Sequence, residues 1–259
     1  MENNLLRSLS RERVSEELLK GFEQSQVPSK YFKLLEETEL LYVAFPEFRG
    51  CKECMHDSRG NHHNESLFQH IVEVLDRLQV SDAKFRLVVA LHDIGKIQTR
   101  SEENDKVFFL EHDKVGAEIV SKRLRELRFS NDVVQYAKTL VANHMRMNKI
   151  LQLCEEGQTW EKSLARLFIE LGENEQLLQD MIRLSSADIR LTDSAMVEVL
   201  LAVNRWSSTT RGITGIDVLN YPKENRGKLL RQMRYIQLTQ GLSRESLLKI
   251  LDGEANNVH

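Results

Sequence analysis

Apolar residues recur three or four positions apart along most of this chain, which is the spacing of one helix face. Val14, Leu18 and Leu19 form one such stripe, and Ser10 before it is the expected N-cap. With only three prolines, 12 glycines and little two-residue alternation, the chain is predicted to be almost wholly helical. Residues 102–110 are the exception, because their β-prone run favours a short hairpin or lid.

Length and composition narrow the class of protein. A chain of 259 residues is long enough to bury one large core or two small ones. It shows no apolar stretch of membrane-spanning length and no signal peptide, so we expect a cytoplasmic protein with no membrane partner. Cys51, Cys54 and Cys154 are too few, and odd in number, for a disulfide framework. The sequence does not indicate an oligomeric state.

The candidate chemistry begins with His92 and Asp93. They close an apolar run that starts near Phe85, and Gly95 after them is typical of a helix end. An adjacent His and Asp late on a buried helix lie about 100° apart, close enough to bind one ion from two directions. The alternative is a hydrogen-bonded pair near a helix end.

Other predicted helices carry further ligand-type residues at inward-facing positions: His70, His112, His144 and Asp188. Taken singly, each histidine is better explained as a satisfied core residue. Taken together, four histidines and two aspartates buried without a shared partner would carry a large desolvation cost. The set therefore favours a shared metal ion.

The order of these six residues resembles that of the HD superfamily of metal-dependent phosphohydrolases: His70, His92-Asp93, His112, His144 and Asp188. The resemblance implies that the first histidine, the doublet and the last aspartate hold one divalent ion, and that the two intervening histidines help to hold a second. It also implies that Lys96 faces the substrate phosphate. A solvated lysine after a helix is the alternative for Lys96.

The donor types indicate which metal would bind. Imidazoles with carboxylates favour one or two transition ions such as Mn, Fe, Co, Ni or Zn over Mg, which prefers oxygen. Such an ion lowers the pKa of its water toward neutrality and so provides a nucleophile for phosphorus. We expect Asp93 to bridge or to orient that water, and Lys96 and Arg190 to stabilise developing charge. Arg190 has a surface role as its alternative, because two positions beyond Asp188 a side chain points away from it on a straight helix.

The flanking segments resemble bacterial tRNA nucleotidyltransferases and poly(A) polymerases. Residues 9–18, 34–41 and 45–47 resemble their helical neck, with Glu39 in place of a glycine. His62-His63 resemble a histidine pair that precedes the HD ligands, and residues 214–219 resemble a motif of the terminal module. We therefore expect an all-α fold with a helical neck-like segment at 1–50, an HD domain at 51–205 and a basic helical C-terminal module at 206–259.

The nucleotidyltransferase head of those enzymes has no counterpart here. Its Gly-Ser and Asp-x-Asp element is found neither before Ser10 nor elsewhere in the sequence. We therefore expect that this chain does not add nucleotides by itself. By resemblance, its HD domain would hydrolyse phosphate esters on nucleotides or RNA ends, including 2′,3′-cyclic phosphates and 2′-phosphates.

A Cys/His-rich segment precedes the HD ligands. Cys51 and Cys54 with His56 are spaced as a zinc half-site, but a polar loop with two unrelated thiols is preferred because no second half follows. The resemblance implies that His63 is a substrate contact or a proton donor.

The C-terminal module is basic although the whole chain has a net charge of −3. Lys223, Arg226, Lys228, Arg231 and Arg234 fall near one another on a predicted helix. They could follow an RNA phosphate backbone, with Lys228 and Arg231 as substrate contacts. A solvated basic face explains them equally well.

Two classes of function follow. The leading one is a metal-dependent phosphohydrolase or phosphodiesterase acting on a nucleotide or RNA end, and a free-nucleotide hydrolase remains within this class. The other is a tRNA-binding module, or a subunit that completes a separate nucleotidyltransferase head, without hydrolytic activity. The six ligand-type residues favour the enzyme.

Overall fold

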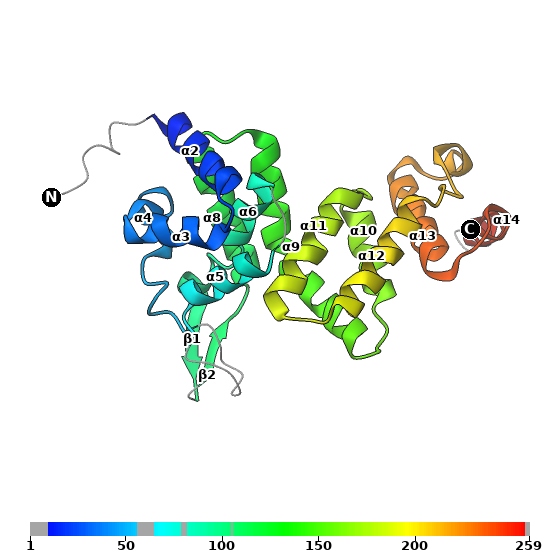
Figure 1. The fold of residues 1–259 in the computed structure, drawn as a ribbon. Coiled ribbons are helices and arrows are strands. Elements are labelled where there is room, and N and C mark those ends of the chain that lie inside the picture. The colour runs from blue at the N-terminus through cyan, green and yellow to red at the C-terminus, as the bar shows by residue number, and fades with distance from the viewer. Residues whose placement is uncertain (1–9, 56–64, 79–81, 105, 257–259) are drawn as a thin grey trace. The chain divides into compact units, whose positions relative to one another are not determined.

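The computed structural model confirms the predicted all-α fold: helices joined by turns, with a small hairpin (Figure 1). The structure describes residues 10–55, 65–78, 82–104 and 106–256. His56, His62 and His63 lie outside the described residues. The chain divides into two compact units, Met1–Asn148 with Arg183–Arg190, and Lys149–Ile182 with Leu191–His259. Within the described ranges, no helix combines the length and the apolar character that crossing a membrane requires.

The first unit begins with short helices: α2 (Arg11–Gln24), α3 (Pro28–Glu37), α4 (Leu40–Ala44) and the 3₁₀ helix η1 (Pro46–Phe48). Ser10 caps α2 as predicted, since its Oγ accepts a hydrogen bond from the Arg13 amide at 3.2 Å. Glu39, in place of the neck glycine, has a left-handed backbone with φ of 60°. The Arg86 guanidinium donates to the carbonyls of Phe22 and Ser25, and so holds the end of α2 to helix α6 (Ala83–Leu91).

The rest of the first unit carries the candidate ligands on these elements: α5 (Leu67–Arg77), α6 (Ala83–Leu91), α7 (Lys96–Thr99), β1 (Arg100–Glu103), β2 (Lys106–Phe109), α8 (His112–Glu126), most of α9 (Asn131–Glu155) and the end of α11 (Glu175–Ile189). Side chains fix where α5 and α6 begin, because Ser66 caps one and Asp82 caps the other. The predicted hairpin is confirmed: β1 and β2 are antiparallel, with Arg100 opposite Phe109.

The second unit contains the remaining helices: α10 (Glu161–Glu170), α12 (Asp193–Ser207), the 3₁₀ helix η2 (Gly215–Val218), α13 (Lys223–Gln240) and α14 (Arg244–Asn256). The C-terminal helices close on a core of six buried apolar residues: Ile213, Val218, Leu229, Met233, Leu247 and Leu251. At the edge of this core, Asp217 forms a capping box with Thr214 and pairs with Arg244 at 2.5 Å. The ion pair of Asp217 and Arg244 therefore holds η2 to the start of α14.

Candidate metal centre

His92 and Asp93 lie in the turn that joins α6 to α7, and both are buried. The expectation that Gly95 ends a helix is wrong, because α6 ends at Leu91 and Gly95 directly precedes α7 with an ordinary φ of −73°. The doublet thus sits just past the helix end, where the chain turns into the unit's interior.

Gly95 is needed for packing and not for backbone freedom. A Cβ at this position would lie 2.2 Å from the carbonyl oxygen of His112 and 2.7 Å from the amide nitrogen of Gly116. The turn therefore lies directly against the first turn of α8, and this approach brings His112 to the doublet. Gly116 was not among the predicted site residues, and its signal in the sequence is a glycine one turn after His112.

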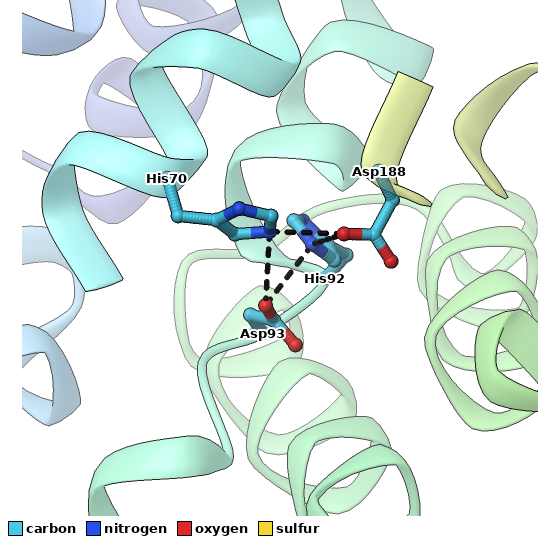
Figure 2. Close-up of side chains that lie close together, drawn as sticks. All are labelled: His70, His92, Asp93 and Asp188. Carbon is cyan, nitrogen blue, oxygen red and sulfur yellow. Dashed lines mark ion pairs between the residues drawn. The ribbon is translucent and has the colours of Figure 1, made fainter. Parts of the chain in front are cut away.

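Four side chains from three parts of the fold converge in a first ligand group, shown in Figure 2: His70 of α5, His92 and Asp93 of the turn, and Asp188 of α11. The Nε2 atom of His70 lies 2.9 Å from Asp188 Oδ1 and 3.4 Å from Asp93 Oδ2. The Nε2 atom of His92 lies 3.2 Å from Asp93 Oδ2 and 3.7 Å from Asp188 Oδ1. One donor atom from each residue lies within 4.8 Å of all the others, so one ion can contact all four.

A second ligand group shares Asp93 with the first and adds His112 of α8 and His144 of α9. The other carboxylate oxygen, Oδ1, lies 3.2 Å from His112 Nε2 and 3.7 Å from His144 Nε2. The two imidazole Nε2 atoms are 3.2 Å apart. Asp93 therefore presents one oxygen to each group, and the structure brings all six sequence-predicted ligands to one place.

Backbone carbonyls orient three of the four imidazoles. The Nδ1 atoms of His92, His112 and His144 lie 2.7–2.8 Å from the carbonyl oxygens of the residues three positions earlier in the chain. An Nδ1–H that donates to a carbonyl leaves Nε2 with its lone pair, the tautomer that binds a metal. The Nε2 atom of His92 is buried and makes no hydrogen bond of good geometry to any described residue. It is therefore available to an ion.

The charges of the first group also suit a cation. Burial by itself would raise the pKa of Asp93, but Lys96 and His92 hold that pKa well below its usual value. Burial likewise opposes ionisation of Asp188, yet His70 and His92 keep its pKa low. Burial lowers the pKa of His92, but the two carboxylates outweigh it and raise that pKa to about 10. Both aspartates thus stay ionised and stabilise positive charge at His92, either the proton that this raised pKa places on Nε2 or a metal ion that displaces the proton.

These observations test whether the residues fit the metal that the sequence predicts. Imidazole nitrogens with carboxylate oxygens are a donor set for borderline divalent transition ions. The pre-oriented Nε2 atoms, the two ionised carboxylates and the buried Nε2 of His92 all fit such an ion. The six residues can therefore hold one or two divalent metals.

Lys96 is buried, with 7% of its surface exposed, so the alternative of a solvated lysine is wrong. Its Nζ lies 2.6 Å from Asp93 Oδ2 and 5.6 Å from the centre of the Phe109 ring. Because Phe109 belongs to β2 and its carbonyl accepts from His112, the hairpin lies beside the ligand groups. Lys96 thus places a positive charge at the edge of the first group.

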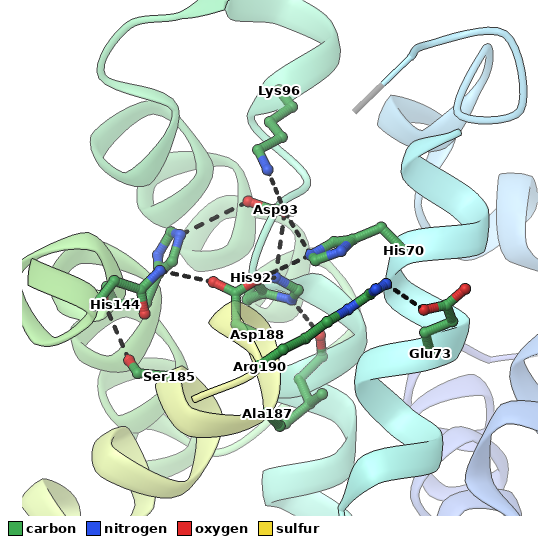
Figure 3. Close-up of polar contacts among 12 residues, drawn as sticks. His70, Glu73, His92, Asp93, Lys96, His144, Ser185, Ala187, Asp188 and Arg190 are labelled. Atoms are coloured by element: carbon green, nitrogen blue, oxygen red, sulfur yellow. Dashed lines mark hydrogen bonds and ion pairs between the residues drawn. The ribbon is translucent and has the colours of Figure 1, made fainter. Parts of the chain in front are cut away.

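Arg190 follows α11 directly, in a left-handed conformation with φ of 54°. Figure 3 shows its side chain extended past Asp188 toward α5, where its Nη2 lies 2.5 Å from Glu73 Oε2. Arg77 binds the same carboxylate oxygen at 2.6 Å and also donates to the Ala187 carbonyl at 2.8 Å. The two arginines and Glu73, here called the Glu73 clamp, tie the end of α11 to α5. Arg190 is therefore already paired where a phosphate contact was predicted.

The basic residues of the C-terminal module divide into two kinds. Lys228 and Arg231, the predicted substrate contacts, are exposed on α13 in the second unit. Arg226 donates to the carbonyls of Tyr221 and Leu219, and Arg234 is buried against Glu173 at 2.8 Å. The expectation that Arg234 belongs to a basic surface is therefore wrong, because Glu173 takes up its charge.

Cys51 and Cys54 are buried free thiols in the turns that follow η1. Burial raises the pKa of Cys51 to about 11, which keeps it protonated at neutral pH. Within the ranges that the structure describes, neither thiol joins a group of three or more metal ligands. His56, the third residue of the zinc half-site considered as the alternative, lies outside those ranges, so that alternative stays untested.

Comparison with known proteins agrees with this geometry. Residues 62–194 match the HD domain family, and residues 2–51 match the family described as a probable RNA and SrmB-binding site of polymerase A. The CC-adding tRNA nucleotidyltransferase of Thermus thermophilus is 31% identical over 208 residues, which cover 78% of this chain and 44% of that protein. The A-adding tRNA nucleotidyltransferase of Deinococcus radiodurans is 32% identical over 184 residues, covering 68% of this chain and 38% of that protein.

The chain thus spans less than half the length of these curated relatives. The HD match, by contrast, covers about half of the present chain and includes all six candidate ligands. This chain therefore belongs to the HD domain family.

Proposed function

We propose that this chain is a metal-dependent phosphohydrolase or phosphodiesterase that acts on nucleotides or RNA ends carrying a 2′,3′-cyclic phosphate or a 2′-phosphate. The observation that carries the proposal is the sharing of Asp93, whose two carboxylate oxygens face different histidine groups. A carboxylate shared in this way suits a site that holds two ions against one phosphate. Membership of the HD domain family supports the same class of reaction.

The six ligands would hold one or two transition ions of the Mn, Fe, Co, Ni or Zn kind. A divalent ion in such a site supplies Lewis acidity and activates water for attack on phosphorus. The chain's own residues do the rest. Asp93 stays ionised and orients the reacting groups, and Lys96 beside it stabilises negative charge on the phosphoryl oxygens. We assign Arg190 to the Glu73 clamp, and so to the position of α11, in preference to the substrate.

The substrate class rests on the relatives. Both are tRNA nucleotidyltransferases by name, and residues 2–51 match an RNA-binding-site family. We therefore propose an RNA end, with tRNA as the first RNA to test, and the cytoplasm as the place of action. We also propose a division into a neck-like segment at 1–50, an HD domain at 51–205 and a basic module at 206–259; the matches over 2–51 and 62–194 favour the first two parts.

The direct test is hydrolysis of 2′,3′-cyclic AMP, 2′-AMP and a tRNA with a cyclic-phosphate end by Mn²⁺-loaded protein. We expect Asp93→Ala to abolish turnover and to lower the bound metal, because both ligand groups lose their shared member. Asp76→Ala is the matched control, since Asp76 is exposed on α5, outside both ligand groups. Turnover that persists in the Asp93 variant would contradict the proposal. Unchanged activity of a His63→Ala variant would show that His63 is neither the substrate contact nor the proton donor that the resemblance implies.

A second candidate function is tRNA binding without hydrolysis, as a module or as a subunit that completes a separate nucleotidyltransferase head. The match of residues 2–51 and the exposed Lys228 and Arg231 favour it. It predicts salt-dependent tRNA binding that weakens when both residues become Glu. Lys249→Glu is the control, because Lys249 already pairs with Glu245 on α14. Bound metal with no hydrolysis of any substrate would put this candidate first.

A further inference from the structure

Asp188 uses its two carboxylate oxygens differently. Its Oδ1 faces the first ligand group, 2.9 Å from His70 Nε2. Its Oδ2 accepts a hydrogen bond from the side-chain amide of Asn148 at 2.7 Å. One oxygen is therefore directed to the ligands while the other is held from the opposite side by a residue that is itself no ligand.

Asn148 is buried, with 5% of its surface exposed, and lies on α9 one turn after His144. Besides Asp188, its Nδ2 contacts only the Met145 sulfur, at 3.7 Å, among the hydrogen bonds of the described residues. Its Oδ1 is buried and has no hydrogen-bond partner in the part of the chain that the structure describes. The bond to Asp188 is therefore the one strong polar contact that accounts for an amide at this buried position.

A second contact also joins α9 to α11. Ser185, one turn before Asp188 on α11, is buried and donates its Oγ to the His144 carbonyl at 3.3 Å. Thus α9 gives His144 to the second ligand group and Asn148 to Asp188 of the first. These two contacts set the register of α11 against α9 at the ligand groups.

We infer that Asn148 is a positioning residue of the metal centre, which fixes the rotamer of Asp188 so that Oδ1 alone faces the ion. A carboxylate without such a partner can rotate and offer either oxygen, or both, and partners of this kind typically change metal affinity about 10–100-fold. The inference rests on the proposed metal centre and extends it to a residue that binds neither metal nor substrate.

Substitutions of Asn148, with Asn143 as the control position, test this role. Asn148→Leu keeps the volume and removes the donor, and Asn148→Ala removes the donor without adding bulk or charge. Asn143→Leu is the matched control on the same helix, since Asn143 bonds only to the Thr139 carbonyl and to Arg146 in the described structure.

The experiment is a Co²⁺ titration of the full chain, read by visible absorption, with thermal unfolding measured without metal. We expect both Asn148 variants to bind Co²⁺ about 10–100-fold more weakly and to show an altered Co²⁺ spectrum, because Asp188 would coordinate differently. The Asn143 variant should keep the spectrum and affinity of the unmodified chain. Should Asn148→Leu not fold, Asn148→Ala carries the test.

Unchanged Co²⁺ affinity and spectrum in a folded Asn148 variant would overturn the inference. A lower unfolding temperature in that variant would not rescue it, because it would show only that Asn148 contributes to packing. That result would leave the proposed function intact. Failure of the unmodified chain to bind Co²⁺ would instead overturn the proposed metal centre and this inference together.

Discussion

At the scale of single residues, Gly95 and Gly116 have different tolerance for a side chain although they face each other. A Cβ at Gly95 would meet backbone atoms of α8 at 2.2 and 2.7 Å, which cannot move without moving the helix. A Cβ at Gly116 would meet its nearest neighbours only at 3.3 Å, the Gly95 amide nitrogen and Cγ1 of Val141. The close approach of turn and helix therefore depends mainly on Gly95.

We predict that Gly95→Ala destabilises the protein by about 1–3 kcal/mol, the usual cost of overpacking. Gly116→Ala should be nearly neutral, because the small steric cost is offset by the roughly 1 kcal/mol that alanine gains over glycine inside a helix. Denaturant unfolding of the two variants measures the difference. Equal destabilisation would show that the approach of Gly95 to α8 is not the tight contact.

Glu39 gives a second residue-scale prediction. Its φ of 60° belongs to the left-handed region, which costs a non-glycine residue about 1 kcal/mol or more. Glu39→Gly should therefore raise the unfolding temperature. Glu16 is exposed in the middle of α2, where glycine costs about 1 kcal/mol of stability. Glu16→Gly should therefore lower the unfolding temperature. A fall for both variants would mean that Glu39 is not strained.

At the scale of elements, η2 is held to α14 by the pair of Asp217 and Arg244. Hydrogen bonds from Arg244 and Thr214 lower the pKa of Asp217 to about 2, below the ordinary 3.8. A carboxyl whose pKa is lower in the folded state stabilises the fold above its unfolded pKa and loses this stabilisation as the pH falls through the folded value. The window here runs from about pH 4 down to about pH 2.

We predict that Asp217→Asn lowers the stability of the C-terminal helices at neutral pH and removes the part of the acid sensitivity that falls in this window. Hydrogen exchange of the amides in α13 and α14 at pH 7 and at pH 3 measures both effects. Identical pH dependence in the variant and the unmodified chain would contradict the role of this pair.

At the scale of the whole molecule, all six candidate ligands belong to one unit, since Asp188 lies in the returning segment Arg183–Arg190. Metal that binds only the folded unit stabilises it by about 2.7 kcal/mol at a concentration 100 times the dissociation constant. We predict that Mn²⁺ slows hydrogen exchange in α5, α6 and α8, and that EDTA reverses this, with little change in α13 and α14. Equal slowing in all of these helices would contradict the assignment of the ligands to one unit.

Much of this molecule could be predicted from the sequence because periodicity and residue type carry that information. Ser10 and the hairpin at 102–110 follow from local rules, and the all-α fold follows from the apolar spacing. Asn148 and Gly116 could not be predicted, since only their neighbours on other helices give them a role. Arg234 and Lys228 are both basic positions of the same predicted helix. Only the ion pair of Arg234 with Glu173 shows that the two have different roles.

The ligands do not follow one another closely along the chain. The chain leaves the first unit after Asn148 and returns at Arg183, so Asp188 comes 44 positions after His144, the ligand before it. During synthesis, which runs at about 5–20 residues per second, the ribosome makes five ligands several seconds before the sixth. A nascent chain that has reached only residue 182 lacks the carboxylate that completes the first group. The finished centre is therefore a late product of translation, formed after most of the unit that houses it.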